Sequence, residues 1–180
     1  ALCGREFGAA RVVACANLPY YITSPAIAAL LESRRLDAAT VMVQREVARR
    51  ICARPGTADY GAFTVFVQWH AEPGILLEVD RTSFVPSPNV DSSVVRLDIR
   101  PAPPVRVEDE AMFFRIVKAA FAQRRKTLLN CLSAAFSGSA GRDKLAECVR
   151  ACGIDPGRRG ETLSIDEFAV LSNAFCKEKF

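Results

Sequence analysis

The chain has 180 residues, of which half are hydrophobic and 24% are charged, a composition typical of a globular protein with room for one domain or one and a half. No apolar stretch approaches the roughly 18 residues of a membrane-spanning helix, and nothing at the start resembles a signal peptide, so we expect a cytoplasmic protein with no membrane partner. The net charge of +4 is compatible with a polyanionic partner but does not by itself indicate one.

The cysteines and the histidine show no metal-binding pattern. The chain has seven cysteines without a CxxC pair, and its single histidine, His70, has no second histidine near it. Cys148 and Cys152 are four residues apart, which on a helix only places them on one face. We therefore expect reduced thiols and no metal site.

The first half of the chain alternates between apolar strands and helices. Residues 12–16 are expected to form a short strand buried on both faces, and Thr23 or Ser24 to cap the helix that follows. A second strand over 39–43 leads into a helix over 44–54 that stops at a Pro-Gly pair. Strand, helix, strand, helix is the order of a doubly wound α/β sheet.

A helix and two further strands complete this part. The helix is expected over 60–70, and the strands over 74–80 and 92–100. Two strands this close, joined by a proline-rich loop, favour an antiparallel pair at the edge of the sheet. The sequence RPAPP at 100–104 predicts a stiff linker and a domain boundary.

Beyond the linker the apolar pattern changes to the 3.6-residue period of helices. The last helix is expected over 165–175, opened by Ser164 with Glu167 at the position of a capping box. We expect residues 1–100 to form an α/β domain and residues 105–180 a small all-helical one.

The sequence Asn-Leu-Pro-Tyr at 17–20 directly follows the first strand. Ligands of open α/β sheets bind at the carboxyl ends of strands. Because a residue before proline is held extended and proline fixes its own backbone, this turn should be rigid. It would present the Asn17 side-chain oxygen, the Leu18 carbonyl and the Tyr20 ring. The alternative is that Asn17 only caps a turn and that the tyrosines pack.

Such an array suits the exocyclic amine of adenine, a poor nucleophile because its lone pair is delocalised into the ring. Two acceptors that bind its two hydrogens favour the pyramidal geometry needed for attack and stabilise the developing positive charge. An aromatic ring replaces the stacking lost when the base is flipped out, worth about 1–3 kcal/mol. This chemistry needs no general base, and no histidine or carboxylate stands beside the turn.

Five segments resemble, in the same order, those of the ribosomal RNA adenine dimethyltransferases that modify small-subunit RNA. They are NLPYYITSPAI from residue 17, MVQREVARRI from 42, FVPSPNVDSSVVRL from 84, FAQRRKTLLNCL from 121 and ETLSIDEFAVLSNAF from 161. The resemblance covers nearly the whole chain. It implies the C-terminal half of a Rossmann-like class I methyltransferase sheet, from about the fourth strand onward, followed by a helical RNA-binding domain.

The resemblance also implies a reaction and a partner. Methyl groups would pass from S-adenosylmethionine to flipped adenines of the small-subunit (16S) rRNA, in the small ribosomal subunit or its precursor, during ribosome biogenesis. Phe84 would face the base from the side opposite the turn, with core packing as its alternative. The resemblance assigns the holding of the adenine to the four residues of the turn, Asn17, Leu18, Pro19 and Tyr20, and places Asn17 also near the methyl donor.

Two groups of basic residues are candidates for RNA contact. Phosphate contacts position an RNA without reading its sequence, so selectivity would come from shape and from the splayed base. Ordinary solvated faces are the alternative for both groups, and Arg158-Arg159 is a weaker candidate. The candidates are Arg45 and Arg49 on one expected helix, and Arg124, Arg125 and Lys126 between two others.

The chain departs from the family pattern where the methyl donor should bind. A methyltransferase of this fold needs a glycine-rich loop after its first strand and an acidic residue after its second. None of the ten glycines forms a G-x-G. We therefore expect the 180 residues alone to be an incomplete, inactive fragment that does not bind the donor. The alternatives are a large-subunit adenine methyltransferase of the antibiotic-resistance type, and a non-catalytic RNA-binding or ribosome-assembly module.

Overall fold

The computed structural model describes residues 11–180, and the chain divides into two compact units. The first unit contains the chain up to Ala53 together with Phe66–Pro103, and the second contains Arg54–Val65 and Pro104–Phe180. The chain enters the second unit for the last time at Pro104, within the RPAPP stretch. Residues 54–65 were predicted within the first domain, 1–100, whereas in the structure their contacts group them with the second unit.

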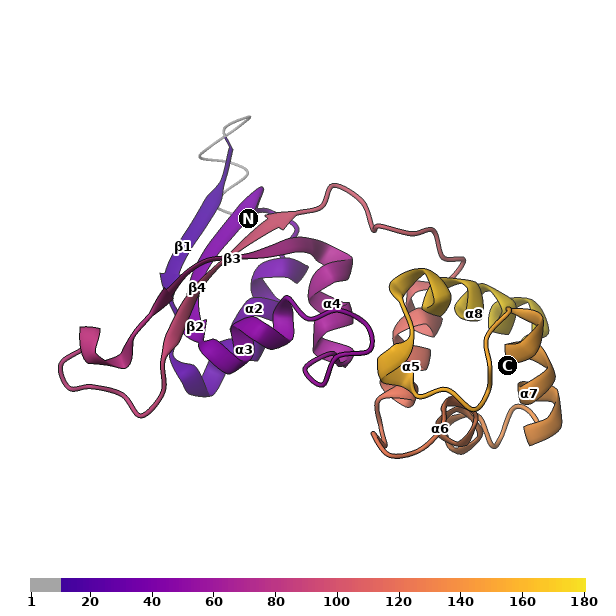
Figure 1. Cartoon of the computed structure of the whole chain (residues 1–180). Helices are drawn as coiled ribbons and strands as arrows, with labels where there is room; N and C mark the ends of the chain where they lie inside the picture. The colour runs from indigo at the N-terminus through magenta and orange to yellow at the C-terminus, as the bar shows by residue number, and fades with distance from the viewer. Residues whose placement is uncertain (1–10) are drawn as a thin grey trace. The chain divides into compact units, whose positions relative to one another are not determined.

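A four-stranded sheet in the order β1-β2-β4-β3 forms the first unit (Figure 1). β1 and β2 are parallel, and β4 is antiparallel to both of its neighbours. The expected α/β order and the antiparallel pair are therefore confirmed. The strands are β1 (Val13–Asn17), β2 (Ala38–Gln44), β3 (Ala71–Val79) and β4 (Ser92–Ile99).

Helices cover one face of this sheet. The helix α2 (Thr23–Glu32) connects the two parallel strands, and α3 (Arg45–Ile51) packs against β2, β3 and β4. Alternate residues of β2 are fully buried while those between them are half-exposed, as expected for a strand with one covered face. α3 is shorter than predicted, and α4 (Ala62–His70) follows it.

Two expectations for the start of the chain were wrong. β1 is not buried on both faces: its residues alternate between exposed and half-exposed, and Val13 is 61% exposed. The physical reason is that, within residues 11–180, β1 pairs only with β2. The other error concerns α2, because Ile22 occupies the N-cap and no side chain caps the helix.

The strand directions bring one end of each of the four strands to the same edge of the sheet. β1, β2 and β3 all end there, and antiparallel β4 begins there. The pairings of Asn17 with Met42, of Gln44 with Ser92 and of Val79 with Ser92 define this edge. We call it the carboxyl edge of the sheet.

The second unit is helical around an aromatic core. The rings of Phe136 and Phe175 meet edge to face at 5.1 Å, and the expected capping box of Ser164 and Glu167 at the start of the last helix is confirmed. The fully buried rings of the unit include Phe113, Phe136, Phe168 and Phe175. Its helices are α5 (Glu110–Ala120), α6 (Leu128–Ala135), α7 (Arg142–Ala151) and α8 (Ile165–Glu178).

The segment 54–65 is tied into the helical unit by polar and ring contacts. The Gly56 amide donates to the Glu161 carbonyl at 2.7 Å, and the buried Tyr60 ring packs edge to face on Phe121 at 5.8 Å. Gly160 touches the backbone of α5, because a Cβ there would lie 2.5 Å from the Ala120 carbonyl oxygen. Only glycine fits that approach without a shift of backbone.

Within the described part of the chain, no helix has the length and apolar character needed to cross a membrane. The same residues contain no group of three histidine, cysteine or acidic side chains able to hold a metal ion. The six cysteines among them are free thiols.

Candidate active site at the carboxyl edge of the sheet

The turn at residues 17–20 begins where β1 ends and is fixed by backbone contacts. The Leu18 amide donates to the Met42 carbonyl of β2 at 3.2 Å, and the Leu18 side chain is buried. Pro19 has φ −58° and ψ 131°, and the chain then closes into a short 3-10 helix, η1 (Tyr20–Ile22), in which Ile22 donates to the Pro19 carbonyl at 3.1 Å. The rigidity expected of the turn therefore has specific hydrogen bonds behind it.

The Thr23 side chain does not cap a helix but forms hydrogen bonds with the backbone of the turn. Thr23 is 2% exposed, and its hydroxyl lies 3.2 Å from both the Pro19 and the Tyr20 carbonyl oxygens and donates to them. These bonds hold the backbone on either side of the Tyr20 amide. The sequence suggested a cap because threonine is common at that position, and its contact with the turn needs the folded geometry.

A buried serine anchors the Tyr20 ring. The Tyr20 and Ser92 hydroxyls share a 2.8 Å hydrogen bond, and Ser92 is fully buried at the first residue of β4. The ring itself remains half-exposed. Sequence reasoning missed Ser92, although a serine pair at the start of an apolar strand was a signal available for it.

The turn leaves two acceptors available to a ligand. The Asn17 side chain is exposed at the end of β1. Among the residues that the structure describes, no group donates a hydrogen bond to the Asn17 side chain or to the Leu18 carbonyl. Both residues therefore lie at the carboxyl edge, within three positions of the anchored Tyr20 ring.

Phe84 lies in the loop that joins β3 to β4, and this loop leaves the same edge. Its ring is half-buried, and its amide donates to the Arg81 carbonyl at 3.3 Å. Asp80 begins the loop and accepts from the Thr82 amide at 2.8 Å and hydroxyl at 2.7 Å, and the bond from the amide, with that from the hydroxyl, lowers the pKa of its carboxyl. The structure thus brings the Phe84 loop to the edge that carries the turn.

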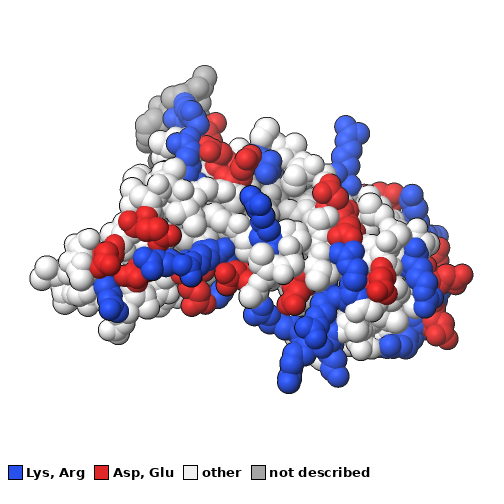
Figure 2. Space-filling model, in the orientation of Figure 1, with Lys and Arg blue, Asp and Glu red and all other residues white. Residues whose placement is uncertain are grey.

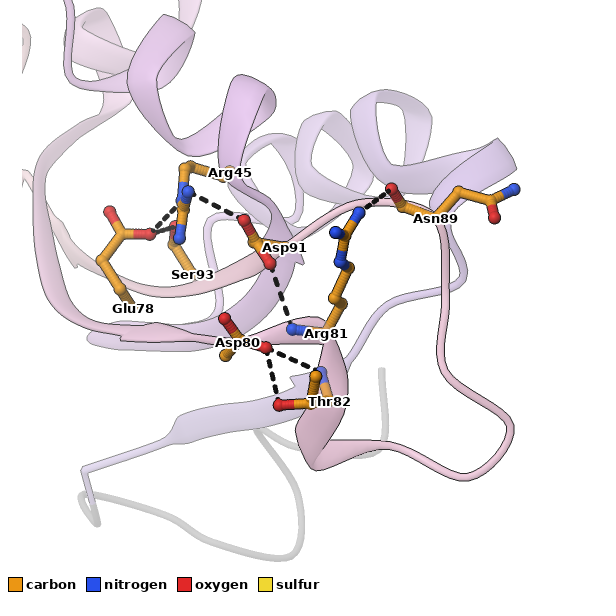
Figure 3. A network of polar contacts seen from close by, with 8 residues as sticks. All are labelled: Arg45, Glu78, Asp80, Arg81, Thr82, Asn89, Asp91 and Ser93. Carbon is orange, nitrogen blue, oxygen red and sulfur yellow. Dashed lines mark hydrogen bonds and ion pairs between the residues drawn. The ribbon is translucent and has the colours of Figure 1, made fainter.

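Arg45 also lies at this edge, but its guanidinium is already bound. Its Nε and Nη1 atoms are each 2.8 Å from a carboxylate oxygen, of Glu78 and of Asp91 respectively (Figure 3). The bond to Glu78 raises the pKa of Arg45. A cation between two carboxylates offers little charge to a phosphate, which weakens its interpretation as an RNA contact. Arg49 is exposed on the same helix and forms no ion pair within the described chain.

The second group of basic residues lies in the loop between α5 and α6, which we call the basic loop (Arg124, Arg125 and Lys126). All three side chains are exposed, and Figure 2 shows basic side chains gathered at the lower edge of the helical unit. Arg124 donates to the Ala58 carbonyl and lies 3.9 Å from the Glu161 carboxylate. Arg125 and Lys126 have no side-chain partner in the part of the chain described.

Arg158 has a structural role within the helical unit. Its guanidinium pairs with the Glu167 carboxylate and donates to the Thr162 carbonyl at 2.6 Å. The hydrogen bond from Arg158 is the main cause that lowers the pKa of Glu167. Arg159, by contrast, is exposed. Of the two arginines in this weaker candidate pair, only Arg159 is available for a phosphate.

The chain is similar in sequence to a family of known proteins. Residues 8–177 match the family model described as Ribosomal RNA adenine dimethylase. A Ribosomal RNA small subunit methyltransferase A from Geobacillus thermodenitrificans is 53% identical over 161 residues, and one from Pelotomaculum thermopropionicum is 55% identical over 161 residues. These matches cover 88% and 89% of this chain but 55% and 54% of the relatives, so the chain spans little more than half their length.

Two solved structures are similar over 94% of the chain. A dimethyladenosine transferase from Plasmodium falciparum has a TM-score of 0.77 at 25% identity, with 68% of that chain covered. The 23S rRNA methyltransferase ErmE has a TM-score of 0.64 at 24% identity, with 69% covered, which shows a shared fold alone. The expected fold class, part of a Rossmann-like methyltransferase sheet followed by a helical unit, is confirmed.

Proposed function

Because this chain belongs to the ribosomal RNA adenine dimethylase family, we propose that the protein transfers methyl groups to the exocyclic amines of adenines in small-subunit (16S) rRNA, in the small subunit or its precursor. Within it, the residues described above hold the target base and the RNA. The observation that carries this proposal is the pinned turn at residues 17–20, with two available acceptors beside an aromatic ring anchored by Ser92.

The turn is suited to activate an amine without removing a proton beforehand. The Asn17 side-chain oxygen and the Leu18 carbonyl would each accept one hydrogen of the adenine amine, which concentrates its lone pair for attack and stabilises the positive charge that develops. The half-exposed Tyr20 ring, and the Phe84 ring of the neighbouring loop, would replace the stacking that a flipped base loses. Pro19 restricts the backbone of the turn, so the acceptors would keep their positions when the base binds.

The methyl donor requires more than these residues supply. S-adenosylmethionine would provide the methyl group, and Asn17, exposed at the end of β1, is one residue here suited to contact it. The ten glycines of the chain form no G-x-G loop that would cradle its amino-acid end. The residues present therefore do not fit a complete donor site, and no step is assigned to the donor.

The RNA would be held by cations that have no protein partner. Arg125 and Lys126 of the basic loop meet this condition best. Arg49 on α3 forms no ion pair within residues 11–180 but interacts electrostatically with Glu78, and Arg124 is partly engaged by Ala58 and Glu161. Such contacts position a folded RNA, and the base-holding turn then selects the adenine. The 53% and 55% identical relatives, both named for the small subunit, favour that RNA over the large-subunit alternative. A cytoplasmic location follows from this substrate.

A chimera tests the proposal. In it, this chain replaces the matching residues of the Geobacillus thermodenitrificans relative, and methyl transfer from labelled S-adenosylmethionine to unmethylated small-subunit particles is measured. We expect transfer by the chimera, and a loss of about ten- to hundredfold for Tyr20→Ala, because base stacking is worth about 1–3 kcal/mol. Tyr20→Phe keeps the ring and should lose less than about tenfold.

The controls separate the alternatives. Large-subunit particles in the same assay should receive no label, and label there in place of the small subunit would favour the antibiotic-resistance type. Particle binding by Tyr20→Ala should stay near that of the unchanged chimera, because the basic loop is intact. A chimera that binds particles but transfers no methyl group would support the non-catalytic binding module and contradict the proposal.

A further inference from the structure

The Arg45 side chain joins the two ends of the loop that carries Phe84. We propose that Arg45 is a positioning residue of the base-binding site: with Glu78, Asp91 and Ser93 it forms a clamp that holds the 80–91 loop at the carboxyl edge, beside the turn that carries Tyr20. The assignment of the clamp to methyl transfer rests on the proposed function. The clamp itself rests on contacts in this chain alone.

One guanidinium closes the loop at both ends. Glu78 lies near the end of β3 and Asp91 directly before β4, and both carboxylates lie 2.8 Å from Arg45 nitrogens. The Arg45 amide also donates to the Asp91 carbonyl at 3.0 Å, so side chain and backbone act on the same residue. Glu78 is held a second time by the Ser93 hydroxyl at 2.9 Å. The planar fork of arginine can bind both carboxylates at once, whereas a lysine ammonium is a single point charge.

The clamp reaches Phe84 through further bonds inside the loop, and Figure 3 shows those that link Asp91, Arg81 and Asn89. The second carboxylate oxygen of Asp91 accepts from the Arg81 amide at 3.1 Å, and the Arg81 guanidinium donates to the Asn89 carbonyl at 3.4 Å. The Arg81 carbonyl then accepts from the Phe84 amide and from the Ser87 hydroxyl. An ion pair and hydrogen bonds therefore run without a break from Arg45 through Asp91 and Arg81 to the backbone of Phe84.

The same clamp reaches the turn from its other side. Asp91 is followed in the chain by Ser92, whose buried hydroxyl binds the Tyr20 hydroxyl at 2.8 Å. Movement of Asp91 would therefore disturb both the loop of Phe84 and the anchor of Tyr20. Arg45 is placed to set how the two rings of the base-binding site lie relative to each other.

The order that the clamp gives to the loop matters more than its effect on overall stability. The Arg45 side chain is 34% exposed and that of Glu78 46%, and exposed ion pairs contribute little to global unfolding. The loop around Phe84 contains two prolines and a 3-10 helix (Arg81–Ser83) capped by Asp80, but no strand or α-helix, so its local hydrogen bonds hold the short helix together while the clamp ties that helix to the strands. Removal of Arg45 should thus loosen the loop while the unit stays folded.

Hydrogen exchange in the 180-residue chain tests the clamp directly. For Arg45→Gln we expect the amides of Arg81, Ser83 and Phe84 to exchange about tenfold faster or more, with the thermal midpoint nearly unchanged. Arg45→Lys keeps the charge but not the fork and should give nearly the same increase. The matched control Arg96→Gln removes an ion pair with Asp98 on β4 and should leave these amides unchanged. Unchanged exchange in both Arg45 variants would overturn the clamp.

Kinetics of the chimera test its role in the reaction. For Arg45→Gln we expect kcat to fall about tenfold while KM for the particle stays within about twofold, since ring placement acts on the reacting complex. A rise in KM alone, restored by Arg45→Lys, would instead identify Arg45 as a phosphate contact and overturn the positioning role. Should Arg45→Gln fail to fold, Asp91→Asn weakens the same ion pair from its other side. An inactive unchanged chimera would count against the proposed function, and the exchange result would still decide the clamp.

Discussion

At the carboxyl edge of the sheet, the rings of Tyr20 and Phe84 remain half-exposed and are held through hydrogen bonds and ion pairs of their surroundings. In the helical unit the order is reversed: buried rings hold the helices, while Arg125 and Lys126 of the basic loop are exposed and have no side-chain partner among residues 11–180. The proposed function, in which this site receives a flat base, needs the rings accessible, and polar contacts position them without burying them. A surface that only offers charge can leave its side chains unpartnered because the core beneath orders the backbone.

Among the changes considered for the helical unit, a substitution at Gly160, which lies against α5, should lower the stability most. Gly160→Ala forces its new Cβ against the Ala120 carbonyl, and overpacking of this kind costs about 3 kcal/mol. The thermal midpoint should fall by about 10 °C, measured by circular dichroism. Gly138→Ala is the control, since nothing lies within 4 Å of its Cβ position. A fall of the same size in both variants would show that helix packing at residue 160 is not the cause.

The ion pair of Arg158 and Glu167 lies in the helical unit, which is built around an aromatic core. It should make the free energy of unfolding depend on pH. The pKa of Glu167 is lower in the folded chain than in the unfolded one, so its contribution is complete above the unfolded pKa of about 4.3 and is lost as the pH falls below it. At pH 7 Glu167→Gln should be less stable by about 1–2 kcal/mol, and the difference should shrink between about pH 5 and pH 3.

Urea unfolding at a series of pH values, with the chain and the variant compared at each, measures this difference. Other carboxylates titrate equally in both proteins and cancel. A difference in the free energy of unfolding that stays constant down to pH 3 would contradict a role for the Glu167 charge. Only the shape of the side chain would then remain as the cause.

The smallest effect on stability is expected where cations have no partner. Arg125→Ala and Lys126→Ala should change the free energy of unfolding by less than about 0.5 kcal/mol. Each should nonetheless weaken binding of a small-subunit RNA hairpin and reduce the slope of log affinity against log salt by about 1. Fluorescence anisotropy over a salt series measures the slope. Arg150→Ala, exposed on α7, is the control, and an equal change there would point to net charge alone.

Local signals in the sequence predicted much of the fold. The buried run of β2, the antiparallel pair and the capping box of Ser164 and Glu167 were all readable from a few neighbouring residues. The burial of β1 was not, because a strand is buried by its neighbours and this one has a single strand partner among residues 11–180. The apolar letters of a strand carry no information on how many neighbours it has.

The site shows the same division between local and distant information. The turn itself was predictable because Pro19 restricts its own backbone and that of Leu18, but its anchor, Ser92, is 72 residues from Tyr20. Arg45 looked like a surface cation because its partners, 33 and 46 positions away in the chain, meet it only through the register of β3 and β4. Charge patterns along a helix cannot distinguish a bound arginine from a free one.

The segment 54–65 makes the helical unit discontinuous in the gene. Gene fragments cut at the proline-rich linker would yield helices without Tyr60, leaving Phe121 without the ring that packs on it at 5.8 Å. During synthesis, residues 54–65 leave the ribosome well before the helices they pack against, so they can adopt their final contacts only after those helices have been made. Exchange of this unit between relatives by recombination therefore needs three crossovers, one at each boundary between the two units, and the two units are inherited together more easily than apart.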